Sequence, residues 1–215
     1  MIVYGSSLSP FVRKVLAFAA EKGIEVESKP IGLNSDDPEF IEASPFKKIP
    51  GFRDGDFAIS DSTAIITYLD AIRPEPNLIA TEPRARARTI WYEEFADTIL
   101  NACGAKMFFN RVVAPRFLGR EGDEAVANEA ECVELPKLLD YLERVIPESG
   151  FLVEDRLTLA DIAVASPFVN LKHLKIVVDP ERYPKVTAYV GAILERPSFK
   201  TLVDKETAFF ERMAA

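Results

Sequence analysis

The chain has 215 residues, of which 48% are hydrophobic and 28% charged, and a formal net charge of −8. This is the composition of an ordinary globular protein, with enough apolar residues for a core without disulfide or metal crosslinks. The negative charge argues against nucleic acid as the main partner, because phosphate backbones bind clustered Lys and Arg. His173 is the only histidine, which excludes most histidine-based nucleophilic and metal sites, and its place near a helix end favours a structural role.

No apolar run reaches the roughly eighteen residues that a membrane helix needs, and the first residues lack the pattern of a secretory signal. Cys103 and Cys132 have neither metal-type nor redox-type spacing. We therefore expect a cytoplasmic protein that binds no membrane and contains no metal.

The first part of the chain alternates strand and helix patterns. Ser9 is a good N-cap and Pro10 suits the first helical position, so a helix is expected to begin there and to end at Gly23. This order of elements closes most simply as a small mixed sheet with helices on both faces. The expected elements are a strand at 1–5, a helix from 10, a strand at 24–31, a short helix at 36–43, a hairpin that turns at 54–55, and a helix from 62 to about 72.

The second part shows helical periodicity only. It follows a segment, 73–83, that carries three prolines and is expected to form a linker. Pro115 is expected to end or kink the first helical segment, and Thr158 and Asp161 form a capping-box variant that starts a buried helix. The helical segments are expected at about 84–118, 124–146, 159–173, 183–195 and 199–212. The predicted fold class is therefore α+β, with a helical bundle after the sheet.

Three places in the first part can carry chemistry. At the first strand–helix turn, the helix N-terminus stabilises an anion, and the Ser9 hydroxyl can donate a hydrogen bond to a thiolate. Before the hairpin, a cis peptide at Ile49-Pro50 would turn the backbone of Ile49 outward, where it can pair with an extended peptide. At the next helix start, Ser62 can hold a carboxylate and Asp61 an ammonium group. Each place also fits a purely structural role as a cap or turn.

Together, these places would serve a thiol, a peptide backbone, a carboxylate and an ammonium group at one edge of the sheet. Arg13, Lys14, Lys47 and Lys48 make this region basic within an acidic protein. An acidic peptide with a cysteine fits this description, and glutathione is the obvious candidate.

The same residues resemble the motifs of the cytosolic glutathione transferase family. Residues 4–15, with Ser9-Pro10-Phe11, resemble the first turn of the serine-type classes such as theta and tau. Two residues depart from the family pattern, since Ser44 stands where Asn is usual and Asp61 where Glu is usual. Further resemblances, in the same order along the chain, lie at 44–50, 59–69, 158–163, 183–184 and 196–199.

The resemblance implies a thioredoxin-like glutathione-binding domain at 1–73, a linker at 74–83 and an all-helical domain at 84–215. It implies a homodimer with residues 84–118 at the contact, and a reaction in which the glutathione thiolate, activated by Ser9, attacks a hydrophobic electrophile. The implied glutathione-binding residues are Lys48, Ile49, Pro50, Asp61 and Ser62. The candidates for the electrophile pocket, each of which also fits a plain core role, are Leu8, Phe11, Phe108, Phe109, Val112 and Phe168.

Alternatives remain open. Ser6, Ser7 or Tyr4 can take the role of Ser9, although the position of Tyr4 inside the first strand fits the serine classes less well. A redox enzyme of this scaffold would need a cysteine at the first helix, where this chain has serine. A glutathione-dependent reductase, isomerase or dehalogenase, or a non-catalytic ligand-binding or interaction member, would share the same scaffold.

Overall fold

A computed structural model describes residues 1–32 and 35–214. Their contacts divide the chain into two compact units. The first unit comprises Met1–Ile79 together with Arg196–Ala215, and the second comprises Ala80–Glu195. The last helix, which the sequence analysis attached to the helical domain, is therefore described here with the first unit.

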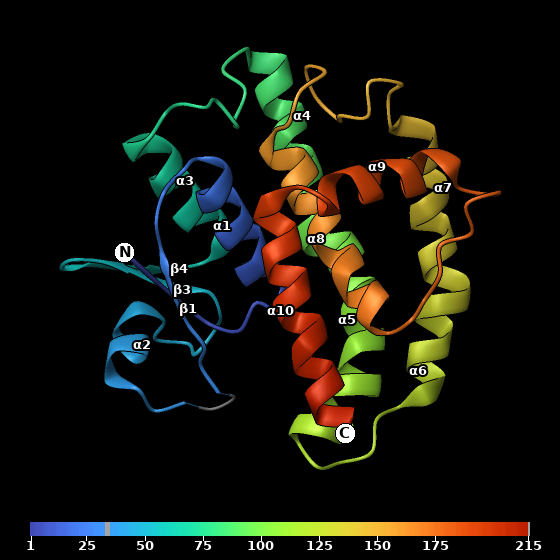
Figure 1. The fold of residues 1–215 in the computed structure, drawn as a ribbon, viewed down its shortest axis with the longest axis horizontal. Helices are drawn as coiled ribbons and strands as arrows, with labels where there is room; N and C mark the ends of the chain where they lie inside the picture. The colour runs from blue at the N-terminus through green and yellow to red at the C-terminus, as the bar shows by residue number, and fades with distance from the viewer. Residues whose placement is uncertain (33–34, 215) are drawn as a thin grey trace. The chain divides into compact units, whose positions relative to one another are not determined.

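The first unit contains a four-stranded mixed sheet (Figure 1). Its strands lie in the order β2-β1-β3-β4. β2 runs parallel to β1, whereas β3 runs antiparallel to both β1 and β4. The strands are β1 (Ile2–Tyr4), β2 (Glu27–Lys29), β3 (Gly51–Asp54) and β4 (Phe57–Ser60). The predicted mixed sheet is confirmed, with β2 shorter than its sequence pattern suggested.

Helices cover both faces of this sheet, which is the thioredoxin-like arrangement. On one face, Tyr4 packs with Phe40 and Ala43 of α2. On the other face, Phe52 contacts the ring of Tyr68 on α3, at a centroid distance of 5.6 Å. The helices of this unit are α1 (Pro10–Glu21), α2 (Pro38–Ala43), α3 (Ser62–Ile72) and α10 (Pro197–Ala214).

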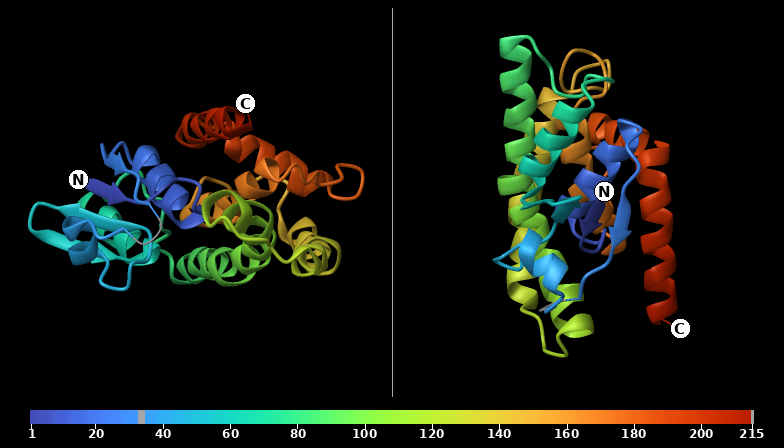
Figure 2. Two further views of the ribbon diagram at one scale, coloured as in Figure 1. Left: turned by 90° about the horizontal axis from the view of Figure 1, so that it is seen from below. Right: turned by 90° about the vertical axis from the view of Figure 1, so that its left-hand side faces the viewer.

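Helix α10 lies beside α1 (Figures 1 and 2). At its N-terminal end, the Arg196 guanidinium donates to both carboxylate oxygens of Glu21, at 2.8 and 2.7 Å. The Ser198 hydroxyl donates to the same carboxylate at 2.5 Å. These bonds attach the start of α10 to the end of α1.

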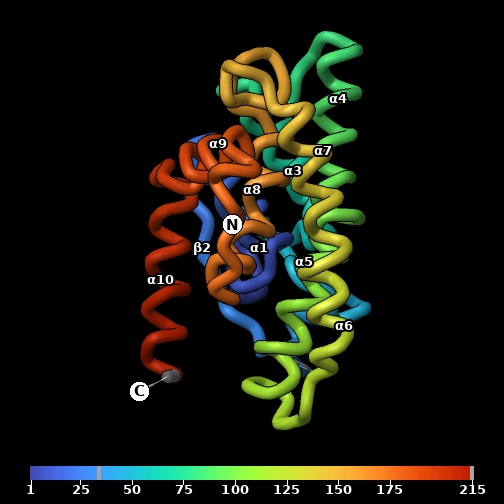
Figure 3. The backbone as a smooth tube through the Cα atoms, turned by 90° about the vertical axis from the view of Figure 1, so that its right-hand side faces the viewer, coloured from blue at the N-terminus to red at the C-terminus, as the bar shows by residue number. Residues whose placement is uncertain are grey.

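The second unit is helical. α4 continues through α5 into η2 without a break, from Pro83 to Phe117, as one long rod (Figure 3). Pro115 lies in the final π-helical stretch, and the rod ends two residues after it, in line with the expected helix end. The elements are α4 (Pro83–Glu94), η1 (Phe95–Leu100), α5 (Asn101–Phe108), η2 (Phe109–Phe117), α6 (Glu124–Glu129), η3 (Ala130–Glu134), α7 (Leu135–Val145), α8 (Leu159–His173) and α9 (Pro184–Leu194).

Helix α8 forms the core of the second unit, since every residue from Leu159 to Leu171 is buried. The predicted capping box at its start is confirmed. Asp161 accepts hydrogen bonds from the N–H and hydroxyl of Thr158 at 2.8 and 3.1 Å. It also accepts from the Leu152 N–H at 2.9 Å and the Tyr189 hydroxyl at 3.2 Å. The motif is therefore structural, as expected. Across the described residues, no helix combines the length and apolarity required to cross a membrane.

Candidate glutathione site

The strand register gathers the three candidate segments at one edge of the sheet. Tyr4, the last residue of β1, pairs with Gly51, the first residue of β3. Gly51 in turn pairs with Ser60, the last residue of β4. Because neighbouring strands lie about 5 Å apart, the turn after Tyr4, the segment before Gly51 and the helix start after Ser60 are close neighbours.

Gly5 sets the contact between the first two of these segments. Its φ of +134° is a conformation that side chains rarely adopt. A Cβ atom at this position would lie 2.9 Å from the Cβ of Ile49 and 2.8 Å from a methyl group of Val12. Only glycine therefore lets the backbone after β1 approach Ile49 this closely.

Ser9 is the N-cap of α1, as predicted, but its side chain makes no capping hydrogen bond. Its carbonyl accepts the first helical bond from the Arg13 N–H at 2.9 Å, and Pro10 occupies the first helical position. Ser9 is only half-buried. The hydroxyl thus lies at a helix N-terminus without serving as a cap, which leaves it available to a bound anion.

The Ile49-Pro50 peptide bond is cis. The loop before it is held by Ser44, whose hydroxyl accepts from the Lys48 N–H at 2.9 Å and donates to the Lys48 carbonyl at 2.6 Å. Ser44 is fully buried. The serine that departs from the family pattern therefore fixes the backbone of the loop that leads to Ile49. The sequence alone does not indicate this role, because the two hydrogen bonds join residues across an irregular loop.

Asp61 and Ser62 begin α3. Asp61 is exposed and is its N-cap, with a φ of 84°. Its Oδ1 atom accepts hydrogen bonds from the N–H groups of Thr63 and Ala64, both at 3.0 Å. Both bonds use the same oxygen, so the second carboxylate oxygen can accept from a ligand. Ser62 is buried at the first helical position, where backbone N–H groups have no partner within the helix.

The expected basic region is only partly correct. Arg13 and Lys14 are buried in the described structure, with exposed fractions of 0% and 1%, so neither is presented to a ligand. Arg13 forms an ion pair with Glu206. Lys47 is exposed but pairs with Asp36 at 2.6 Å. Lys48 is exposed at the edge of the site. The local positive charge therefore depends on Lys48 far more than on α1.

Tyr4 is placed for packing. It is fully buried, and its hydroxyl donates to Glu39 of α2 at 3.3 Å. Burial raises the pKa of this phenol, which opposes its use as a thiol-activating group near neutral pH. The Ser6 hydroxyl accepts from the Leu8 N–H at 3.3 Å, within the turn itself. Of the alternatives to Ser9, Tyr4 is thus disfavoured by its surroundings.

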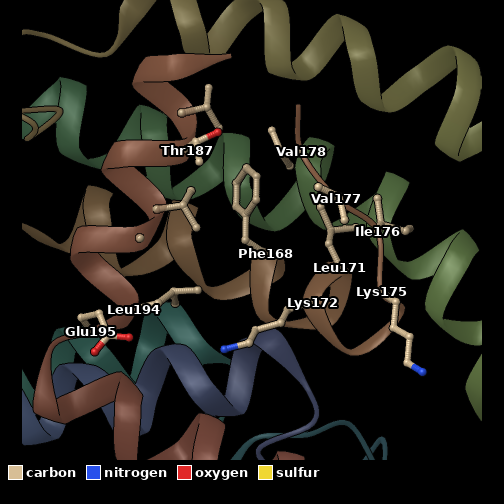
Figure 4. A pocket seen from close by; sticks show the side chains of 13 residues that line it. Phe168, Leu171, Lys172, Lys175, Ile176, Val177, Val178, Thr187, Leu194 and Glu195 are labelled. Carbon is tan, nitrogen blue, oxygen red and sulfur yellow. The ribbon is translucent and has the colours of Figure 1, made fainter. Parts of the chain in front are cut away.

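The residues proposed for the electrophile pocket have varied surroundings. Leu8 and Phe11, in the first unit, are half-buried. In the second unit, Phe108, Val112 and Phe168 are buried. Phe109 is 39% exposed and carries the guanidinium of Arg120 at 5.3 Å from its ring centre. Phe168 lines a cavity between α8 and α9 (Figure 4). The assignment of these six residues to an electrophile pocket stays a prediction.

Both cysteines lie in the second unit. Cys103 is buried in α5, and burial raises the pKa of its thiol to about 11. Cys132 is exposed in η3. Neither lies at the start of α1, where a redox enzyme of this scaffold would carry its nucleophile. Among the described residues, no group of three or more His, Cys, Asp or Glu side chains is arranged to hold a metal ion.

Comparison with known proteins identifies the scaffold. Residues 3–77 match the family model of the glutathione S-transferase N-terminal domain, and residues 109–206 match that of the C-terminal domain. A glutathione S-transferase of Hyoscyamus muticus is 30% identical over 209 residues, which span 95% of this chain and 98% of that protein.

Two solved structures extend the comparison. A glutathione S-transferase from Rhodospirillum rubrum superimposes with a TM-score of 0.86 at 25% identity, covering 94% of this chain and 90% of that one. Glutathione S-transferase I from maize, in complex with an atrazine–glutathione conjugate, gives a TM-score of 0.83 at 25% identity, covering 94% and 96%. A thioredoxin-like sheet followed by a helical domain is the architecture of these transferases. The chain belongs to the glutathione S-transferase family.

Proposed function

We propose that this enzyme conjugates the thiolate of glutathione to hydrophobic electrophiles, and that the Ser9 hydroxyl activates the thiol, as in the serine-type classes. The observation that carries the proposal is the position of Ser9. It lies at the N-terminus of α1 with a hydroxyl that makes no capping bond, at the sheet edge shared with Ile49 and Asp61.

The peptide part of glutathione fits the remaining groups at this edge. No backbone hydrogen bond of Ile49 is found among the described residues, which leaves its N–H and carbonyl for an extended peptide. Asp61 has a carboxylate oxygen for the ammonium group, and the N-terminus of α3 at Ser62 suits a carboxylate. Lys48 adds positive charge for the second carboxylate. The maize relative, which holds a glutathione conjugate, supports this assignment.

The thiolate is the nucleophile in this proposal, and the thiol is not. The N-terminal partial charge of α1 and the hydrogen bond from Ser9 both stabilise the anion, so the pKa of the bound thiol falls towards neutrality. An electrophile held beside the sulfur then reacts in an oriented, local attack rather than a slow bimolecular one. Leu8 and Phe11, next to Ser9 in sequence, are the first candidates for contact with that electrophile.

We also propose that the enzyme acts in the cytoplasm as a homodimer. Two large apolar side chains favour a protein contact: Phe46 is 85% exposed, and Trp91 on α4 is 50% exposed. Sedimentation equilibrium of wild type and of Phe46→Glu tests this. A dimer that dissociates in the variant supports the contact, and a monomeric wild type refutes the homodimer.

The decisive experiment measures glutathione binding by calorimetry and follows thiolate absorbance against pH in the same samples. Wild type is expected to bind glutathione at millimolar concentration or below, as thiolate near neutral pH. Ser9→Ala is expected to bind but to raise the pKa of the bound thiol by about one to two units. This is the equivalent of a charge-assisted hydrogen bond of about 1.5–3 kcal/mol.

Ser7→Ala is the matched control, since it removes a hydroxyl from the same turn. An unchanged thiol pKa in Ser7→Ala with a raised one in Ser9→Ala assigns the role to Ser9. The reverse result moves the role to Ser7. Failure of wild type to bind glutathione would contradict the site itself and favour a non-catalytic member of the family.

A further inference from the structure

One buried side chain holds the loop between α2 and the cis peptide. Ser44 is the C-cap of α2 and is fully buried. Its N–H donates to the Phe40 carbonyl at 2.7 Å, and its carbonyl accepts from the Lys47 N–H at 2.9 Å. Its hydroxyl bonds both backbone groups of Lys48. Three of these four hydrogen bonds therefore go to the loop that leads to Ile49.

The fourth bond attaches Ser44 to the core of the first unit. Phe40 is 2% exposed and packs against Tyr4 of β1, with the two ring centres 6.3 Å apart. The loop itself is not relaxed, since Lys47 has a φ of 53°, a left-handed conformation that residues other than glycine adopt at a cost. The loop thus depends on its bonds to Ser44 to keep this conformation.

The bonds from Ser44 also divide the loop backbone between structure and ligand. The N–H and carbonyl of Lys48 are both engaged by the Ser44 hydroxyl, at 2.9 and 2.6 Å. The next residue, Ile49, has no backbone hydrogen bond among the described residues. The side chain of Lys48 is exposed. A peptide ligand at this edge would therefore use the backbone of Ile49 and the charge of Lys48, and Ser44 fixes the position of both.

We propose that Ser44 is a positioning residue that sets the affinity of the enzyme for glutathione. It holds Lys48 and Ile49 in the binding geometry before the ligand arrives. A group that is ordered in advance loses less entropy on binding, so affinity falls when that order is lost. Because Ser44 is fully buried, it acts through Lys48 and Ile49 and not by contact with the thiol. This inference rests on the proposed function, since it assumes that glutathione binds at this edge.

Ser44→Ala tests the role of the hydroxyl. The variant is expected to raise the Kd for glutathione about tenfold in calorimetry, the size of effect typical of a lost hydrogen bond. With chlorodinitrobenzene as the electrophile, the KM for glutathione is expected to rise by a similar factor. At saturating glutathione, kcat and the pKa of the bound thiol should match wild type, whereas Ser9→Ala raises that pKa.

Two further variants separate positioning from general stability. Ser44→Thr keeps the hydroxyl and is expected to bind glutathione within about threefold of wild type. Ser166→Ala is the matched control, because Ser166 is a buried serine of α8 in the second unit. It is expected to keep the wild-type affinity for glutathione even where it lowers the free energy of unfolding. Circular dichroism checks that each variant is folded before titration.

Backbone hydrogen exchange, followed by NMR, observes the loop directly. In the protein without ligand, the Lys48 amide is expected to be protected, and to exchange at least tenfold faster in Ser44→Ala. The Ile49 amide is expected to become protected only when glutathione is added. A Lys48 amide that exchanges in wild type as freely as the amides of exposed loops would overturn the proposal, whether or not Ser44→Ala folds.

The binding results also separate this inference from the proposed function. Failure of wild type to bind glutathione would refute both. Normal binding by wild type, with unchanged affinity in folded Ser44→Ala, would refute the positioning role alone. An equal loss of affinity in Ser166→Ala would likewise refute it, because general destabilisation would then explain the effect. A raised pKa of the bound thiol in Ser44→Ala would show that Ser44 acts on the thiol instead.

Discussion

Arg13 and Glu206 form a buried ion pair between residues 193 positions apart in sequence. The guanidinium Nε lies 3.1 Å from Oε1 and Nη2 lies 2.7 Å from Oε2, and the two residues are 0% and 3% exposed. Since Arg13 also donates its N–H to the Ser9 carbonyl, the pair connects α10 to the turn of α1 that holds Ser9. Removal of one partner of such a buried pair destabilises the protein, because the other charge stays buried without its counter-ion.

Glu206→Ala is therefore expected to lower the free energy of unfolding by about 3–5 kcal/mol in urea titrations followed by circular dichroism. Glu148→Ala serves as the control, since Glu148 pairs with Lys185 at the surface, with 89% of its side chain exposed. It should cost about 1 kcal/mol or less. Equal costs for the two substitutions would show that burial of the Arg13 pair has no energetic consequence.

Gly5→Ala is expected to damage both stability and ligand binding. The added Cβ conflicts with Ile49 at 2.9 Å and imposes a strained φ of +134°. Strain and overpacking together predict a loss of about 2–5 kcal/mol in the free energy of unfolding. Glutathione affinity should fall in the remaining folded protein, because Ile49 must move.

The control is Gly104→Ala in α5, where a Cβ meets no atom within 4 Å. There the substitution should stabilise the protein by up to about 1 kcal/mol, since alanine favours a helix over glycine. If Gly104→Ala lowered the free energy of unfolding by as much as Gly5→Ala does, the close approach to Ile49 would not be the cause of the loss.

Asp161 is expected to make stability depend on pH in the acid range. Burial raises the pKa of its carboxyl above the ordinary value of 3.8. The folded protein then keeps this proton to higher pH than the unfolded chain does. The contribution of Asp161 to the stability of the folded protein is therefore fully present below pH 3.8. It is lost as the pH rises through the pKa of the folded state.

Asp161→Asn removes this titration. The variant is expected to be less stable than wild type, by about 1–3 kcal/mol at low pH, because an amide cannot accept all four hydrogen bonds. The difference between the two proteins should shrink as the pH rises from about 3 to 6 in parallel urea titrations. If the difference in the free energy of unfolding grew with pH instead, the hydrogen bonds to Asp161 would have a larger effect on its pKa than burial has.

Thiol labelling should distinguish the two cysteines. Cys132 is exposed, whereas Cys103 is buried with a thiol pKa of about 11. At about pH 8 a disulfide reagent should modify one thiol per native chain quickly, and the second only in denaturant. The fast reaction should disappear in Cys132→Ser and persist in Cys103→Ser. Rapid labelling of both thiols would contradict the burial of Cys103.

The sequence predicted local features well because local rules govern them. The N-cap at Ser9, the capping box at Asp161 and the helical segments all follow from residue type and spacing within a few positions. The mixed sheet followed from the order of elements. Together with the family motifs, these patterns were enough to indicate which residues meet at the sheet edge.

Long-range partners were not predictable in this way. Arg13 and Lys14 looked like ligand-facing charges, because no local pattern shows that Glu206 comes to meet Arg13. The grouping of α10 with the sheet depends on the same contact and on the bonds from Arg196 to Glu21. Ser44 looked like a minor departure until its two hydrogen bonds to Lys48 were seen.

The grouping of α10 with the sheet has a consequence for synthesis. A ribosome releases the strands and α1 long before it releases residues 196–214, while the second unit is complete by residue 195. Until α10 emerges, Arg13 lacks the carboxylate of Glu206, and burial of a guanidinium is costly unless it is paired. The unit that begins first is thus the last to be completed, and the turn at Ser9 acquires its final support only when nearly the whole chain has been made.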